Sequence, residues 1–222
     1  MILYTAIFGG IDDAIRLRRA HPILPEGSRC VVFSDILKTE DMVGSCWEAR
    51  PAIWTHLNPR RTARWHKINS TKLFPGEVTA WFDGSLLIRE GADFGKLLSY
   101  VSMCDLATFK HPIRECVYQE GLACIKLKKD LQVVIDAQIT RYILGKYPRN
   151  AGMVETSCVV RRDTLAVSQL EEAWWQEIDQ GSLRDQLSFN FVARQMGFEY
   201  GIIPGCRDGS EWFEFRQHSR KG

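Results

Sequence analysis

The chain has 222 residues, of which 45% are hydrophobic and 25% charged, a composition that argues against a disordered protein. Its net charge is only +2, so no overall field points to a polyanionic partner. The seven cysteines show no CxxC or other metal-ligand spacing, and we expect free thiols in a reducing compartment. The apolar start, MILYTAIFGG, is too short for a membrane-spanning helix and lacks the basic region of a secretory signal. We therefore expect a soluble, cytoplasmic protein without a membrane partner.

Apolar runs and amphipathic segments alternate along the chain. Strands are predicted at residues 2–8, 30–35, 46–53, 78–85, 106–111 and 157–163. Helices are predicted at residues 14–20, 59–75, 93–104, 131–147, 170–178 and 185–196, the last of them closed by Gly197. The predicted apolar face of the helix at 131–147 consists of Leu131, Val134, Ile135, Tyr142 and Ile143.

This alternation predicts an α/β fold, a mainly parallel mixed sheet with helices on both faces. No linker-like stretch divides the chain, so we expect one domain over residues 1–222, with the polar and aromatic residues 205–222 running over its surface. Ligands of such sheets bind beyond the carboxyl ends of the strands. Small or polar residues occur at these ends: Gly9, Gly10, Asp35, Asp83, Lys110 and His111.

The pair Gly9-Gly10 follows the first predicted strand. Glycine lets the backbone approach a ligand closely and offers amides near a helix start, a common way to accommodate phosphate or ribose. By itself, however, the pair favours the alternative, a simple turn between strand and helix.

The helix predicted at 59–75 carries a cationic face. Arg61 and Arg64, with either Lys67 or Arg60, recur at three- and four-residue spacing. Such a face suits a diphosphate, because guanidinium groups bind its oxygens in a bidentate manner. A solvated charged face is the alternative interpretation.

Asp83 ends the apolar run VTAWF and is followed by Gly84 and Ser85. An ionised carboxylate at this point is expected to lie on a rim, cap the turn or hold a cation. Magnesium or manganese shared with a diphosphate would suit the hard oxygen ligands of the last case. His218, near the C-terminus, is either a free tail histidine or a late ligand that closes such a metal site.

The segment FKHPIRECVYQEG gathers polar side chains around a predicted strand end: Lys110, His111, Arg114, Glu115 and Glu120. Pro112 prevents smooth continuation of the strand. This density fits an acceptor or phosphate pocket, and a surface loop is the alternative.

The segment SLRDQLSF also allows two interpretations. Ser182 and Asp185 have the spacing of a helix-capping pair ahead of an apolar run. In the functional interpretation, Asp185 is a general base or orients the acceptor, and Gln186 lies in the acceptor pocket.

Residues 4–205 contain, in order, the phrases YTAIFGGIDD, CVVFSD, RRTARWHKINSTKLFP, WFDGS, FKHPIRECVYQEG and RDQLSF. Together they resemble a glycosyltransferase family once catalogued as a domain of unknown function, whose members include plant proteins tied to mucilage polysaccharide and turgor regulation. The resemblance implies a GT-A-type, Rossmann-like α/β fold that binds a nucleoside diphosphate sugar.

The resemblance also implies roles for individual residues. The implied donor-binding residues are Ala6, Phe8, Gly9, Gly10, Asp35, Arg61, Arg64, Lys67 and Asp83. Asp83 stands where GT-A enzymes keep their metal-binding D-x-D motif, with His218 as the implied late metal ligand, so a divalent metal (manganese or magnesium) is the implied cofactor. Asp185 is implied to face the acceptor and the anomeric carbon. WFDGS has only one acid, so arginine or lysine would share the stabilisation of the leaving group.

The leading hypothesis is a glycosyltransferase that moves a hexose or pentose from a nucleotide-sugar donor to a hydroxyl group. The acceptor is a glycan, a small molecule or a modified nucleic-acid base. One alternative is a nucleotidyltransferase on a similar sheet. The other is a non-catalytic nucleotide-sugar or nucleic-acid binding module, which the basic clusters RLRR, PRRTAR and KLKK leave open.

Overall fold

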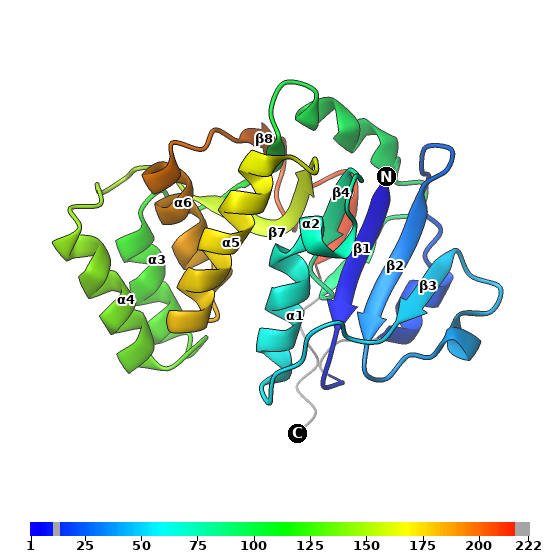
Figure 1. The fold of residues 1–222 in the computed structure, drawn as a ribbon, viewed down its shortest axis with the longest axis horizontal. Helices are drawn as coiled ribbons and strands as arrows, with labels where there is room; N and C mark the ends of the chain where they lie inside the picture. Colours follow the sequence, from blue (N-terminus) through cyan, green and yellow to red (C-terminus); the bar gives the residue numbers. More distant parts are fainter. Residues whose placement is uncertain (11–13, 216–222) are drawn as a thin grey trace.

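The structure, a computed structural model, describes residues 1–10 and 14–215 of the chain. Its main sheet has seven strands: β1 (Ile2–Ile7), β2 (Arg29–Ser34), β3 (Trp47–Arg50), β4 (Thr79–Phe82), β6 (Leu106–Lys110), β7 (Val154–Arg161) and β8 (Gly201–Ile203). Their order is β3-β2-β1-β4-β7-β6-β8 (Figure 1). Neighbouring strands are parallel except that β7 runs antiparallel to both β4 and β6. The predicted mainly parallel mixed sheet is confirmed.

Helices cover both faces of this sheet. The α-helices are α1 (Pro59–Ile68), α2 (Ser70–Leu73), α3 (Val117–Lys126), α4 (Gln132–Leu144), α5 (Leu165–Gln180) and α6 (Asp185–Met196). The 3-10 helices are η1 (Ala14–Arg19), η2 (Thr39–Met42) and η3 (Phe94–Val101). In Figure 1, α3 and α4 lie on the side of the molecule away from β2 and β3. No helix in the described ranges is long and apolar enough to cross a bilayer.

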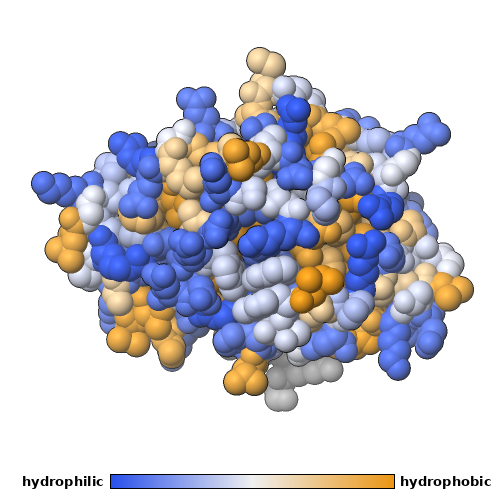
Figure 2. Space-filling view, in the orientation of Figure 1, coloured by the Kyte–Doolittle hydropathy of each residue, from blue (hydrophilic) through white to orange (hydrophobic). Residues whose placement is uncertain are grey.

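The sheet separates two apolar cores, because successive residues of a strand point to opposite faces. Tyr4 and Trp81 pack into the core formed with the α-helices. Their neighbours Leu3 and Phe82 pack into the opposite core, which is closed by the 3-10 helices and the C-terminal segment. The outer face over α1 and α5 is mostly hydrophilic, with apolar residues in small separate groups (Figure 2). Because the residues on both faces of the strands are buried in these cores, the strand ends are held in place at the edge of the sheet.

Helix α3 begins within the segment FKHPIRECVYQEG, for which a surface loop was the alternative prediction. Val117, Gly121 and Cys124 are buried at helical spacing. At Gly121 an added Cβ would lie 3.0 Å from Ile139 of α4, so glycine permits the close approach of the two helices. The buried face of α4 also differs from the prediction, since it holds Gln138 between Ile135 and Tyr142. Leu131 and Ile143, predicted to belong to that face, are exposed.

Residues 205–215 return to the core, whereas the sequence predicted that residues 205–222 run over the surface; residues 216–222 lie outside the described part of the chain. Strand β9 (Phe213–Phe215) pairs antiparallel with β5 (Leu86–Ile88), which begins three residues after Asp83. Trp212 is buried and donates from Nε1 to the carbonyl of Asp93 at 2.8 Å. This pairing brings residues 205–215 beside the strand ends.

Candidate functional site

A cavity of about 550 Å³ opens at the edge of the sheet where the parallel strands end. Ala6 and Phe8 line it from the end of β1, Asp83 from the end of β4 and His111 from the end of β6. Strand β7 runs the opposite way, so its first half brings Glu155 to the same cavity. Ligands of open α/β sheets bind at this edge. The predicted convergence of strand ends therefore holds for β1, β4 and β6.

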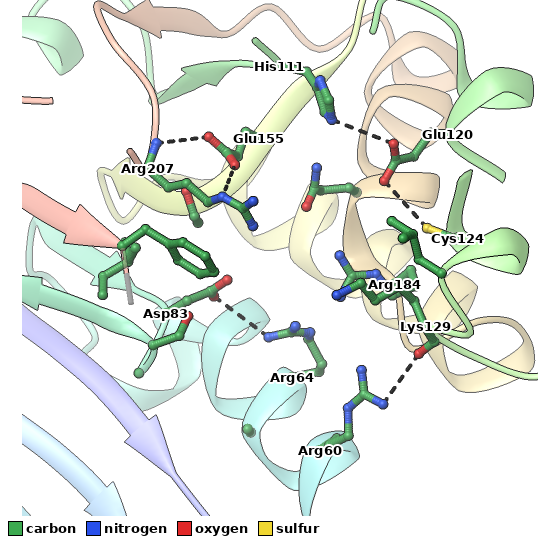
Figure 3. Close-up of a pocket in the computed structure, with 18 of the residues that line it drawn as sticks. Arg60, Arg64, Asp83, His111, Glu120, Cys124, Lys129, Glu155, Arg184 and Arg207 are labelled. Carbon is green, nitrogen blue, oxygen red and sulfur yellow. Dashed lines mark hydrogen bonds and ion pairs between the residues drawn. The ribbon is translucent and has the colours of Figure 1, made fainter. Parts of the chain in front are cut away.

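Cations outnumber acids on the wall of the cavity. The cationic residues are Arg60, Arg64, Arg114, Lys128, Lys129, Arg184 and Arg207. The acids are Asp83, Glu120 and Glu155. Burial and the nearby charges of Arg64 and Arg184 lower the pKa of Arg60, so these three guanidinium groups lie close enough to repel one another. Figure 3 shows them around one part of the cavity, an arrangement that suits an anion.

Helix α1 places part of this cationic wall. It begins with Pro59 at its first position, and the Asn58 side chain accepts a hydrogen bond from the Arg60 amide at 3.0 Å. Arg60 and Arg64, four residues apart, then face the cavity. Arg61 turns away, contrary to its predicted contact with a diphosphate. Its Nη1 donates to the carbonyls of Ile178 (2.8 Å) and Asp179 (3.1 Å) at the end of α5, where cations are favourable.

Lys67 lies beneath the cavity and bridges two carboxylates. Its Nζ is 3.0 Å from Asp83 Oδ1 and 2.5 Å from Asp185 Oδ2. Arg64 joins the same group, with Nε 3.0 Å from Asp185 Oδ1 and Nη1 3.7 Å from Asp83 Oδ1. The side chains of Lys67, Asp185 and Asp83 are 0%, 2% and 25% exposed. The two acids and two bases form a charge-balanced cluster of which Asp83 is the accessible carboxylate, and Lys67 does not itself line the cavity.

The Asp83 carboxylate is held by one of its oxygens. Oδ1 accepts hydrogen bonds from Lys67 Nζ and from Trp81 Nε1, both at 3.0 Å. Within the described part of the chain, both side-chain hydrogen bonds that this carboxylate accepts go to Oδ1, so Oδ2 is the oxygen that a ligand would approach. The carboxylate therefore does not cap the turn at Gly84 and Ser85, which was the alternative interpretation.

Asp185 occupies a different environment from the one that either sequence interpretation required. Its Oδ2 accepts from Thr156 Oγ1 at 2.6 Å, and its carboxylate lies behind the cavity wall. Burial alone would raise the pKa of Asp185, but the positive charges of Arg64 and Lys67 outweigh it and hold this pKa below the ordinary value. A buried, fully paired carboxylate of low pKa is a weak general base. The sequence left open whether Asp185 is a general base or orients the acceptor, and the geometry favours a positioning role over that of a base.

The capping interpretation of SLRDQLSF also differs from the structure. Helix α6 begins at Asp185 itself, with Arg184 as its N-cap residue. Ser182 Oγ donates to Asp130 Oδ2 at 2.7 Å and forms no capping pair with Asp185. Gln186, predicted for the acceptor pocket, does line the cavity.

The residues around Asp83 fit a divalent metal poorly. Among the residues that the structure describes, no three His, Cys, Asp or Glu side chains come together as metal ligands. The two acids that converge, Asp83 and Asp185, already share the ammonium of Lys67. His218 lies outside the described residues, so its predicted role as a ligand stays a prediction.

His111 and Arg114, both from the segment FKHPIRECVYQEG, also line the cavity. The His111 Nδ1 accepts hydrogen bonds from the amides of Ile113 (3.2 Å) and Arg114 (3.0 Å), and its Nε2 is 3.5 Å from Glu120 Oε2. Arg114 Nε also donates to Glu120. Burial alone would raise the pKa of Glu120, but the hydrogen bonds from His111 and Arg114 outweigh it and lower this pKa to about 2. These contacts hold His111, Arg114 and Glu120 together as one charged group.

Four of the residues predicted at strand ends lie outside the cavity: Gly9, Gly10, Asp35 and Lys110. The amide of Gly9 donates to Asp35 Oδ2 at 3.0 Å, so this carboxylate holds a turn in which Gly9 (φ 74°) and Gly10 (φ 64°) adopt the left-handed conformation. This contact favours the simple-turn interpretation of the glycine pair. Lys110 is exposed and pairs with Glu115 at 2.8 Å. Successive residues of a strand point in opposite directions, so Lys110 points away from the cavity that its neighbour His111 lines.

Sequence reasoning missed Arg184, Glu155 and Arg207. Arg184 is the first residue of the phrase RDQLSF, in which the predicted roles belong to its neighbours Asp185 and Gln186. Glu155 and Arg207 carried no local signal, because they meet only when the C-terminal segment returns to the site. Glu155 Oε2 accepts from the Arg207 amide at 2.9 Å and Oε1 lies 3.3 Å from its Nε (Figure 3). The Arg207 guanidinium stacks over Phe215 at 4.1 Å, which secures the segment against the cavity.

Comparisons with known proteins agree with this architecture. The chain is similar to mouse xyloside xylosyltransferase 1 in its apo form, with a TM-score of 0.52 and 10% identity over 91% of this chain and 84% of that chain. This similarity extends to the fold, which is the GT-A type. The chain is also similar to the WbbM bifunctional glycosyltransferase, with a TM-score of 0.48 and 10% identity over 91% of this chain. It spans 38% of that protein.

No curated protein sequence matches the chain. A family model, the TOD1/MUCI70 glycosyltransferase-like domain, matches residues 36–206, which is most of the chain. The match covers both the cationic helix and the segment RDQLSF. The chain therefore belongs to the TOD1/MUCI70 glycosyltransferase-like domain family.

Proposed function

We propose that the protein transfers one sugar, a hexose or a pentose, from a nucleoside diphosphate sugar to a hydroxyl group of an acceptor. The observation that carries the proposal is the cavity at the carboxyl edge of the sheet, which is lined by Arg60, Arg64 and Arg184 together with Asp83. Membership of a glycosyltransferase-like family supports transfer of a sugar as the reaction class. A diphosphate matches the cationic wall, and the hydroxyl acceptor would enter beside His111, Arg114 and Gln186.

The reaction needs one bond to form and one to break. The acceptor oxygen bonds to the anomeric carbon of the sugar, while the bond from that carbon to the diphosphate oxygen breaks and its electron pair leaves with the diphosphate. The hydroxyl proton passes to a carboxylate. Most of the rate enhancement would come from positioning the two substrates and from neutralising the charge that develops on the diphosphate.

Two carboxylates in the cavity suit the remaining tasks. Asp83, with Oδ1 held by Lys67 and Trp81, would orient the transferring sugar through Oδ2. Burial raises the pKa of Glu155, although the bonds and charge of Arg207 oppose this shift. A carboxylate with a raised pKa accepts a proton more readily, so we assign Glu155 as the base on the acceptor side.

A thermal-shift screen of nucleoside diphosphate sugars tests the proposal, because a ligand that binds the native state raises its melting temperature. We expect one donor class to raise it in the wild type and to do so less in an Arg60→Ala variant. Arg149→Ala removes the same charge from an exposed site outside the cavity and serves as the matched control. Absence of a shift with every donor would contradict the proposal. Release of pyrophosphate from a nucleoside triphosphate would instead indicate a nucleotidyltransferase.

A further inference from the structure

We propose that protein cations neutralise the leaving diphosphate, and that the ammonium of Lys67 holds the position between Asp83 and Asp185 that a divalent metal would otherwise take. This inference rests on the proposed function and specifies how its site handles charge. It predicts a donor site that works without a bound metal.

The geometry around Lys67 is the first support. A metal shared by Asp83 and Asp185 would have to lie where the Lys67 Nζ now lies, 3.0 and 2.5 Å from their carboxylate oxygens. Lys67 is completely buried, and its Nζ also donates to Thr156 Oγ1 at 3.4 Å. A metal would therefore have to displace a buried, fully bonded side chain.

Charge balance is the second support. Lys67 and Arg64 together match the two negative charges of Asp83 and Asp185. A divalent cation added here would leave an excess of two positive charges in a largely buried cluster, which is unfavourable because buried charges need partners. The balanced cluster also has no net charge to offer a diphosphate. The neutralising charge must then come from the other cations of the wall.

Arg184 is the third support, because part of its guanidinium group lacks a partner. Its Nε is buried and has no hydrogen-bond acceptor within the described residues. Arg60, on the same wall, makes a long hydrogen bond of 3.4 Å from Nη1 to the carbonyl of Lys129. Arg184 and Arg60 both line the cavity, so diphosphate oxygens bound there would give their guanidinium groups charge-assisted acceptors. The wall is therefore arranged to receive an anion directly.

Calorimetry with inorganic pyrophosphate tests the inference on the full chain. Pyrophosphate is titrated into the wild type, Arg184→Ala and Arg162→Ala, first with EDTA and then with manganese. Arg162 is exposed beyond the far end of β7, so its removal changes the net charge equally at the opposite edge of the sheet. We expect the wild type to bind with EDTA present, and Arg184→Ala to weaken binding roughly 10- to 100-fold, as for loss of one hydrogen bond to a charged group. Arg162→Ala should bind like the wild type.

The possible failures are distinguishable. If pyrophosphate binds only with manganese, or if manganese tightens binding more than about tenfold, the metal-free site is refuted while the proposed function stands. Equal weakening by Arg184→Ala and Arg162→Ala would refute the role of Arg184. If neither pyrophosphate nor any nucleoside diphosphate binds in either buffer, the proposed function falls as well. Manganese alone, followed by its electron paramagnetic resonance signal, should stay free in the presence of the wild type, and depletion of that signal would refute the role of Lys67.

Discussion

Replacing Lys67 by methionine removes a buried ammonium while keeping most of the side-chain volume. Asp83 and Asp185 then lose contacts of 3.0 and 2.5 Å. Removing one partner of a buried ion pair costs about 3–5 kcal/mol, because a charge is left without compensation. Arg64 still contacts Asp185 at 3.0 Å, so we expect a loss near the lower end, about 3 kcal/mol.

Urea unfolding followed by circular dichroism measures this loss near neutral pH. Arg141→Met is the matched control, since it removes an ion pair with Glu177 in which the side chains are 45% and 14% exposed. An exposed pair of this kind contributes less than about 1 kcal/mol. The difference in free energy of unfolding between Lys67→Met and the wild type should become smaller in acid, because a protonated Asp185 no longer needs the ammonium.

A loss for Lys67→Met no larger than that for Arg141→Met would refute the reasoning, provided that both unfold with the same dependence on urea. If the difference in free energy of unfolding between Lys67→Met and the wild type stays constant as the pH is lowered, Asp185 is not the partner that Lys67 stabilises.

Other predictions concern the site residues. Asp83→Asn should abolish sugar transfer with an unchanged circular dichroism spectrum, because an amide no longer offers the same charged oxygen; normal turnover would exclude Asp83 from the mechanism. Arg64→Ala should weaken donor binding more than acceptor binding, because it leaves Asp83 and Asp185 with an uncompensated negative charge that repels the diphosphate; equal donor affinity by calorimetry would contradict this effect. Glu155→Gln should slow transfer by roughly 100-fold or more while leaving donor affinity unchanged, and an unaltered rate would exclude it as the base. The pKa of Glu120 is lowered from 4.5 to about 2, so ionised Glu120 should contribute about 3 kcal/mol to the free energy of unfolding. This contribution should be fully present above pH 4.5 and lost as the pH falls through about 2. Urea unfolding over this range should show a shallower pH dependence in Glu120→Gln, and an unchanged slope would contradict the assignment.

Local sequence patterns determined much of the secondary structure. The apolar runs that became β1 and β4 are buried strands, and Gly197 ends α6 with φ 61°, as the sequence predicts for a C′ residue. Periodicity was less informative about which face is buried. Gln138 of α4 is buried because its Oε1 accepts from the Ser182 amide at 3.0 Å, while the apolar Ile143 is exposed. A pattern predicts an apolar face, but the neighbouring elements decide what covers it.

The sequence alone also determined that small and charged residues end several strands, and a parallel sheet brings such ends to one edge. This is why Asp83 and His111 could be predicted near one cavity, whereas Arg64 was predicted there from the cationic spacing along its helix. Only the tertiary structure decided that Arg184 faces the cavity while Arg61 binds the end of α5. Residue type and spacing are local properties, whereas the partner of a charge depends on how α1 packs against α5 and α6. For the same reason, only packing could enclose Lys67 between two aspartates from distant parts of the chain.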